Sequence, residues 1–427
     1  GWCCLRLNHR GSVNSARDIC PLQDQSMSIR SANSPKNHQS RLMWSLAAAV
    51  ACRILLNTAR RFIYPFAPTF SRGLGVPLTA ITSLIAVNQA TSVIGLFFGP
   101  VSDRIGYRVM MLCSLGMLAL GMLAAGIVPV YGMVLIALFL AGLGKSIFDP
   151  AIQAFVGERV AYHRRGQAIG FLEISWAGSS LIGIPLMAFL ITTQGWRASF
   201  IVLGFLALAG GVVLGFLLPK DRQQAAGGMR PGALLGAHKS LLKNRAAMGA
   251  LVFAFFFNGA NDIFFVVYGA WLEKAFDISV MALGAGTAVI GVAELFGEGL
   301  TASLSDRLGL KKSVMAGAGI TILNYAMIPL YGHSLTLAFT GIFFLFLTFE
   351  FTIVTSIALY TEILPEARAT MIAAVMAAAG LGRVAGALAG GVVWLFGGIV
   401  ATGVVSAVFT GVALIALLIG FSQWQDG

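Results

Sequence analysis

Apolar residues occur along this chain in long blocks, and short polar stretches separate the blocks. A helix needs about 20 apolar residues to cross a bilayer, and a helix satisfies all of its own backbone amides within lipid. The pattern predicts twelve such helices, at residues 43–69, 78–100, 109–128, 131–157, 167–192, 197–218, 246–272, 279–303, 313–331, 335–361, 368–395 and 397–421. We therefore expect an all-α, multi-pass integral membrane protein with twelve transmembrane helices.

The longest polar connection lies between the sixth and seventh helices, at residues 219–245. It divides the chain into an N-terminal bundle of six helices (43–218) and a C-terminal bundle of six (246–421). Residues 1–42 are polar and lack the apolar core of a signal peptide, so we expect a disordered cytoplasmic tail there. Residues 422–427 are expected to form a short C-terminal tail.

Composition and charge placement add topology to this picture. Hydrophobic residues make up 57% of the chain and charged residues 11%, whereas soluble domains have about 25% charged residues. The net charge is +12, yet only Arg72, Arg197 and Lys274 lie in loops after odd-numbered helices; the other basic loops follow even-numbered ones. Because basic loops stay in the cytoplasm, both termini are expected on the cytoplasmic side. The basic charge thus reports the topology, and no nucleic-acid partner is expected. The expected location is a bacterial inner membrane.

A short polar motif occurs twice. Residues 99–108 read "GPVSDRIGYR" and residues 302–312 read "ASLSDRLGLKK", which places Asp103 and Asp306 203 positions apart. Arg165 and Arg368 keep the same offset. The two bundles are therefore parallel repeats of one another, an architecture of secondary transporters whose substrate site lies at the bilayer midplane between the halves.

The stretch "GPVSDRIGYRVMM" (99–111) resembles the signature loop between the second and third helices of the major facilitator superfamily. The stretch "GIPLMAFLITTQGWRASF" (183–200) is similar to the fifth helix and following loop of its drug:proton antiporter branch, although Leu138 stands where that branch has an arginine in its fourth helix. The resemblance implies two pseudo-symmetric six-helix bundles that rock around a central cavity. In this superfamily the first, fourth, seventh and tenth helices line that cavity.

The repeated loops are candidates for a cytoplasmic gate. Asp103 can accept hydrogen bonds from helix N-termini and from nearby arginines, and Gly106 permits a tight turn. The predicted gating residues are Gly99, Asp103, Arg104, Gly106 and Arg108 in the first loop and Asp306, Arg307, Gly309 and Lys311 in the second. The alternative is that these loops only set the topology.

Charged residues within the predicted helices are the candidates for the transport site, because each costs at least about 2.5–3.5 kcal/mol to insert and so faces a cavity or a partner. On the first helix, four polar residues with spacings of four, three and four share one face. The predicted substrate-binding residues are Arg53, Asn57, Arg60 and Tyr64 on this face, with Lys145, Asn258, Asn261 and Glu350 on later helices.

Three carboxylates are candidates for carrying a coupling proton: Asp149, Glu173 and Asp262. A carboxyl group withdrawn from water can exchange a proton near neutral pH. A structural alternative is that Lys145 and Asp149 simply neutralise one another, and that Arg383 pairs with a glutamate. Glu294 is a further intramembrane charge, and Glu298 is expected at the membrane interface.

Other motifs carry no chemistry. "AGLGKS" (141–146) lacks the first glycine of a phosphate-binding loop, and the small residues Ala378, Gly382, Gly386 and Gly390 form a helix-packing ridge. No cofactor motif, metal cluster or nucleophile with a base is visible, so we expect a monomeric transporter and not an enzyme. Our first hypothesis is export of a small organic solute in exchange for protons. The alternatives are uptake or exchange of an organic anion, or a receptor or assembly role on a transporter fold.

Overall fold

The structure is a computed structural model that describes residues 35–95, 98, 105–160, 162–219, 243–364 and 368–422; the side chains of 35–41, 162–169, 306 and 369 are not described. All regular structure in these ranges is helical. The N-terminal half contains α1 (Pro35–Arg61), α2 (Ala67–Leu74), α3 (Leu78–Gly95), α5 (Tyr107–Ile127), α6 (Tyr131–Arg159), α7 (Tyr162–Gly178), the π-helical turn η1 (Ser179–Gly183), α8 (Ile184–Gln194) and α9 (Trp196–Leu217). The C-terminal half contains α11 (Arg245–Phe265), α12 (Tyr268–Phe276), α13 (Val280–Leu308), α14 (Leu310–Tyr331), α15 (Leu335–Ile363) and α16 (Arg368–Gly420).

The twelve predicted spans are confirmed, with breaks inside several of them. The first span is α1 followed by α2, and the fifth runs through α7, η1 and α8, where the wide turn precedes Pro185 and accommodates its missing amide donor. The last two spans are the two parts of α16, which meet at Gly397 and Gly398. Gly398 has φ +58°, a left-handed conformation that suits glycine. The first helix begins at Pro35, within the range assigned to the predicted tail, and residues 1–34 lie outside the described residues.

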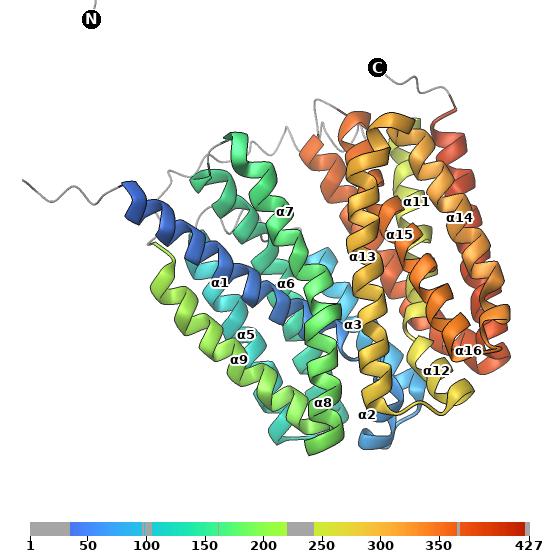
Figure 1. Ribbon diagram of the computed structural model, residues 1–427, viewed down its shortest axis with the longest axis horizontal. Coiled ribbons are helices and arrows are strands. Elements are labelled where there is room, and N and C mark those ends of the chain that lie inside the picture. Colours follow the sequence, from blue (N-terminus) through green and yellow to red (C-terminus); the bar gives the residue numbers. More distant parts are fainter. Residues whose placement is uncertain are drawn as a thin grey trace, which may run out of the picture.

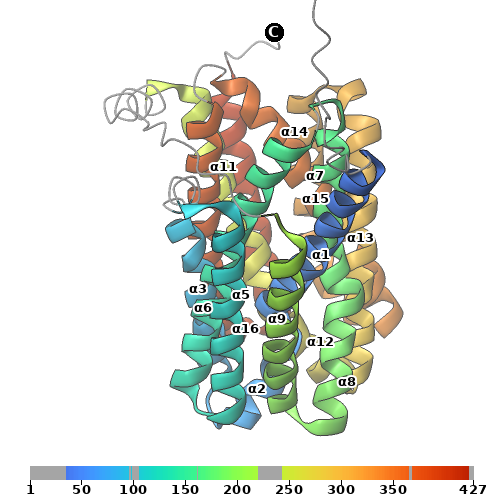
Figure 2. The same cartoon turned by 90° about the vertical axis from the view of Figure 1, so that its left-hand side faces the viewer.

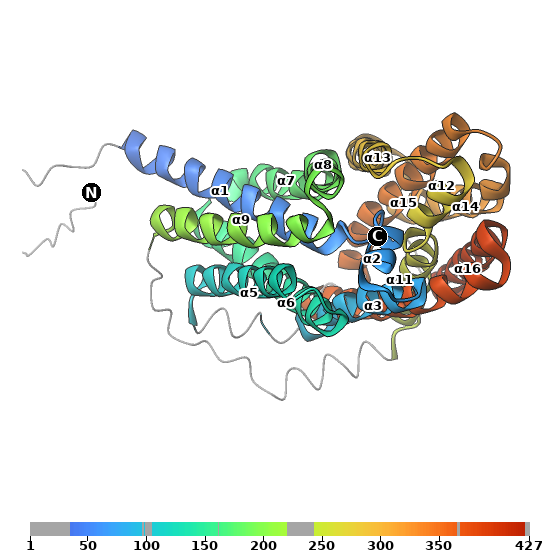
Figure 3. The ribbon, with the colours of Figure 1, turned by 90° about the horizontal axis from the view of Figure 1, so that it is seen from below.

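The two halves lie side by side, each a bundle of helices, with α2 and α3 of the N-terminal half reaching the C-terminal half in Figures 1 and 3. The start of α1 and the end of α16 lie on one side of the molecule, which we call the terminal side. The short helices α2 and α12 lie on the opposite side, which we call the α2–α12 side. Because the chain enters α1 and leaves α16 on the same side, it crosses the molecule an even number of times.

Two seams join the halves. Helix α3 packs against α16 along one seam, and α7 and α8 pack against α13 along the other. The seams lie on opposite edges of the molecule, as the positions of α3 and α13 show in Figures 2 and 3. Between them, on the α2–α12 side, Gly269 lies directly against the backbone carbonyl of Pro65 and Arg72 is paired with Glu273 at 2.6 Å. The halves are therefore in close contact on the α2–α12 side.

Glycines allow helices within the C-terminal half to approach closely. A Cβ on Gly382 or Gly386 would collide with the backbone carbonyls of Phe255 or Gly259 on α11. These close contacts confirm the predicted packing ridge. The small residues of the ridge allow α16 to pack closely against α11 over several turns. As a result Arg383, the next residue after Gly382, is held beside α11.

Candidate functional site

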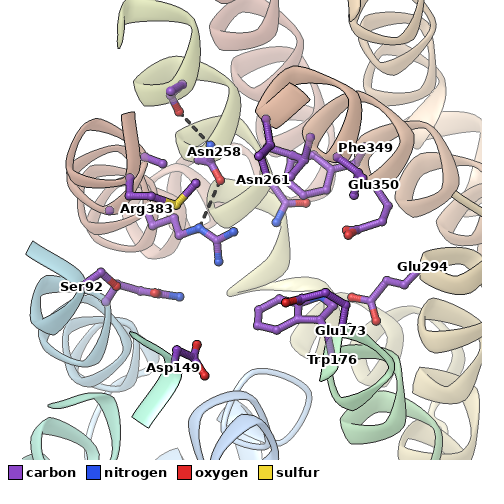
Figure 4. A pocket seen from close by; sticks show the side chains of 18 of the residues that line it. Ser92, Asp149, Glu173, Trp176, Asn258, Asn261, Glu294, Phe349, Glu350 and Arg383 are labelled. Atoms are coloured by element: carbon purple, nitrogen blue, oxygen red, sulfur yellow. Dashed lines mark hydrogen bonds between the residues drawn. The ribbon is translucent and has the colours of Figure 1, made fainter. Parts of the chain in front are cut away.

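A cavity of about 760 Å³ lies between the halves, within the size range of small-molecule sites. Its walls come from α1, α6, α11 and α15, as the resemblance implied, and also from α3, α7, α13 and α16. Lining residues such as Gly95, at the end of α3, and Val375, near the start of α16, extend the cavity toward the terminal side. With the α2–α12 side in close contact, these lining residues indicate a cavity reached from the terminal side. Figure 4 shows the side chains that line it.

Seven of the eight predicted substrate-binding residues line this cavity. They are Arg53, Arg60, Tyr64, Lys145, Asn258, Asn261 and Glu350. The exception is Asn57, which is fully buried and donates from Nδ2 to the hydroxyl of Ser175 at 3.3 Å. Helix α7 packs against α1 at this level and keeps Asn57 out of the cavity, so three of the four polar residues on this face of the first helix line the cavity.

The N-terminal half holds a network of ion pairs that closes within that half. Arg53 Nε donates to Asp149 Oδ1 at 2.9 Å, and Arg53 Nη1 donates to Glu173 Oε1 at 3.1 Å. Lys145 Nζ donates to the other oxygen of Asp149 at 2.5 Å. Two basic and two acidic side chains therefore neutralise one another, which confirms the expected Lys145–Asp149 pair and adds Arg53 and Glu173 to it.

Arg60, in contrast, is held by neutral side chains. Its Nε donates to Asn88 Oδ1 at 3.0 Å, its Nη2 donates to Ser92 Oγ at 2.7 Å, and Nη2 also donates to Gln89. Within the described residues no carboxylate lies at ion-pair distance from Arg60. The sequence analysis missed these three partners on α3, although polar residues at positions i, i+1 and i+4 of an apolar span were a signal for them.

A second missed feature is a buried ion pair between the halves. Arg61 Nη2 lies 2.6 Å from Glu294 Oε1, and the two side chains are only 4% and 3% exposed. The hydroxyl of Ser180 donates to Glu294 at 3.1 Å, and the guanidinium of Arg61 stacks over Trp176 at 4.3 Å from the ring centroid. This pair lies along the α7 and α13 seam.

Asp262 makes a contact between the halves on the other side of the cavity. Tyr64 Oη donates to Asp262 Oδ1 at 2.9 Å, and Arg383 Nε lies 4.0 Å from Asp262 Oδ2. Arg383 Nε donates to Asn258 Oδ1 at 3.1 Å (Figure 4). The expectation that Arg383 pairs with a glutamate is wrong, because the glycines around it hold it against α11 and not against the glutamates of α13 and α15.

Three of the polar side chains that line the cavity from the C-terminal half have no hydrogen bond or ion pair within the described ranges. Glu350 and Glu298 line the cavity and make no hydrogen bond or ion pair with another described residue. Glu298, expected at the membrane interface, is therefore a cavity residue. Asn261 is 5% exposed, points into the cavity in Figure 4, and its Oδ1 has no hydrogen-bond partner in the described part of the chain. Buried polar atoms normally have partners, so these three groups are available to a ligand.

The comparisons with known proteins match this architecture. The Major Facilitator Superfamily profile matches residues 49–268, which is about half of the chain. The chain belongs to the Major Facilitator Superfamily. Membership makes it a secondary transporter of a solute and not an enzyme.

Similar members of the superfamily occur in Bacillus subtilis (strain 168). The MFS-type transporter YceJ is 24% identical over 64% of this chain and 69% of its own length. The transporter YwfA is 22% identical over 85% of this chain and 88% of its own. Among solved structures, a bacterial homologue of the human lysosomal transporter Spinster, inward-facing and unoccupied, superposes with a TM-score of 0.73 at 15% identity, covering 91% of this chain and 99% of that one. The last comparison supports the superfamily fold.

The structure describes only part of the two repeated loops, at residues 99–108 and 302–312. Gly99, Asp103 and Arg104 lie outside the described residues, and so does the side chain of Asp306. Gly106 has φ of +106°, which fits the tight turn predicted there, and Gly309 has φ of +85° at the matching place in the second loop. The gating roles stay predictions.

A basic residue in each of these loops makes an equivalent contact in its own half. Arg108 donates to the carbonyl of Gly215 on α9, and Lys311 donates to the carbonyl of Phe421, just after α16, at 2.8 Å. These two residues are 203 positions apart, and each holds the last helix of its own half. Arg307, another predicted gating residue, is exposed.

Proposed function

We propose that this protein exports a small organic solute in exchange for protons by alternating access, each chain acting as a monomer around its own cavity. The observation that carries the proposal is the buried carboxylate of Asp262, which accepts a hydrogen bond from Tyr64 of the other half at 2.9 Å. A carboxylate in this place changes the strength of a contact between the halves when it gains or loses a proton. The similarity of residues 183–200 to the drug:proton antiporter branch supports export as the direction.

The physical argument concerns the charges around Asp262. Tyr64 and Arg383 contact it, and Arg60 lies within electrostatic range. A proton on Asp262 removes the negative charge, so the hydrogen bond from Tyr64 loses its charge assistance and the attraction of both arginines is lost. Rocking of the halves has to break the Tyr64–Asp262 contact, and proton binding is thereby linked to rocking.

The other two candidate proton carriers are less suited to this role. Asp149 and Glu173 are both paired with Arg53, and all three residues belong to the N-terminal half. A proton on either carboxylate changes a contact within one half and leaves the contacts between the halves as they are. We therefore assign the coupling proton to Asp262.

Proton exchange can be tested in inside-out membrane vesicles whose lumen is acidified by respiration. Addition of a solute that is exchanged for protons dissipates the pH gradient, which an acridine dye reports. We expect ethidium, benzoate or L-tryptophan to do so with the wild-type protein and none of them with Asp262→Asn. The matched control is Asp277→Asn, an exposed carboxylate in a left-handed backbone conformation that asparagine tolerates. Gradient loss that is unchanged in Asp262→Asn would remove Asp262 from the mechanism.

Transport of an organic anion is the second candidate, and the neutral partners of Arg60 favour it. A guanidinium without a carboxylate can bind a substrate carboxylate through paired hydrogen bonds. The same vesicles separate the candidates. Exchange of organic anions predicts benzoate flux without proton movement, and either form of anion transport predicts loss of benzoate flux in Arg60→Ala.

A further inference from the structure

The charges around the cavity differ between its two edges. Near the α3–α16 seam, Asp262 lies 4.0 Å from Arg383, whereas Arg60 has no carboxylate at ion-pair distance among the described residues. Among the described residues no hydrogen bond reaches either terminal nitrogen of Arg383, and Figure 4 shows this guanidinium pointing into the cavity. This edge of the cavity therefore has an excess of positive charge.

The opposite edge has an excess of negative charge. Glu294, Glu298 and Glu350 lie there on α13 and α15, and Arg61 is paired with Glu294 alone. A Cβ on Gly297 would lie 2.8 Å from the Cβ of Glu350, so α13 and α15 touch at this level and bring Glu298 near Glu350. Figure 4 shows Glu350 and Glu294 facing Arg383 from the other side of the cavity.

The space between these edges is lined by rings. Trp176 from α7, Phe265 from α11, and Phe346 and Phe349 from α15 all line the cavity. The ring of Phe349 stacks on Phe257, with centroids 5.0 Å apart and planes 6° apart. The N-terminal network of Arg53, which is neutral as a group, adds no net charge to either edge.

We infer that the transported solute is a zwitterion with an aromatic or apolar body, whose acid group binds Arg383 and Arg60 and whose ammonium group binds Glu350 and Glu298. The inference rests on the proposed function, because it takes this cavity as the transport site. A solute with one charge satisfies one edge and leaves the other with unpaired charge in a largely apolar setting. Asn261, with its unpartnered amide, provides a further hydrogen bond between the two edges.

Equilibrium binding to the purified, full-length protein in detergent tests this inference. The probes form two matched series. L-tryptophan is compared with tryptamine, which lacks the acid, and with indole-3-propionate, which lacks the amine. The compound 4-(aminomethyl)benzoate is compared in the same way with benzylamine and 4-methylbenzoate. We expect the zwitterion of at least one series to bind about tenfold or more tightly than both of its singly charged analogues.

Two variants assign the charges to the edges. Glu350→Gln should abolish the advantage of the zwitterion over the acid, and Arg383→Gln, which can still hydrogen-bond to Asn258, should abolish its advantage over the amine. The matched control is Glu362→Gln, an exposed glutamate on the same helix as Glu350, which should leave the preference unchanged. A merely structural role would weaken all three probes of a series together and leave their ratios as they are.

The inference is overturned if no zwitterion binds, or if in both series a singly charged analogue binds as tightly as its zwitterion. The wild-type series alone decides this, so it does not depend on the folding of a variant. Binding is measured without a gradient. If the proposed proton exchange fails, the zwitterion preference can still hold. If the protein exchanges a singly charged solute for protons, the zwitterion inference is wrong and the proposed proton exchange stands.

Discussion

The two halves share a fold, yet they differ in how their intramembrane charges are paired. In the N-terminal half, Arg53 and Lys145 are matched by Asp149 and Glu173 within 2.5–3.1 Å. In the C-terminal half, Glu350 has no ion-pair partner in the described ranges, although it lines the same cavity. On this comparison, the ion pairs of Arg53 stabilise the N-terminal half. The unpaired cavity residues of the C-terminal half are the groups that we propose bind the ligand.

The largest effect is expected from breaking the N-terminal network. Asp149→Ala leaves Lys145 without its partner and Arg53 with Glu173 alone, which leaves a buried positive charge uncompensated. We expect a loss of roughly 3 kcal/mol of stability, seen as a lower apparent melting temperature of the purified protein. Asp277→Asn is again the exposed control. An unchanged melting temperature would show that this network does not stabilise the half.

A smaller effect of opposite sign is expected in the C-terminal half. Glu350→Gln removes a charge that no described residue compensates, so the protein without ligand should gain roughly 1 kcal/mol. The apparent melting temperature should rise, in contrast to Asp149→Ala. A fall comparable to that of Asp149→Ala would mean that Glu350 also has a structural partner, and the distinction between the halves would be lost.

The smallest effect is expected at the rim on the α2–α12 side. Arg72 and Glu273 join the halves at 2.6 Å, but the side chain of Arg72 is 60% exposed. Exposed pairs contribute less than about 1 kcal/mol, so Arg72→Gln should shift the balance of conformations only slightly. Distances between spin labels at Gln194→Cys and His333→Cys, both exposed, can measure that balance. A major redistribution would show that the rim pair, and not the buried contacts, holds this side together.

Prediction of the site from the sequence succeeded where one helix decides which residues share a face. Lys145 and Asp149 are four residues apart on α6 and were expected to pair, and they do. The first helix was harder, since Asn57 has the spacing of its neighbours and yet packs against Ser175. Helical spacing predicts a direction, and the neighbouring helix determines what lies there.

The sequence by itself determined the membrane class, the number of spans, the repeat of 203 residues and most of the polar residues around the cavity. These follow from hydropathy, from local spacing and from the high cost of placing charges in lipid, all of which act along the chain. The tertiary structure alone decided the partners. Arg61 meets Glu294 and Tyr64 meets Asp262 across about 200 or more residues of sequence, and glycines on α16 turn Arg383 toward Asn258. Such pairings depend on how helices from two halves pack, and this information lies in no single stretch of the chain.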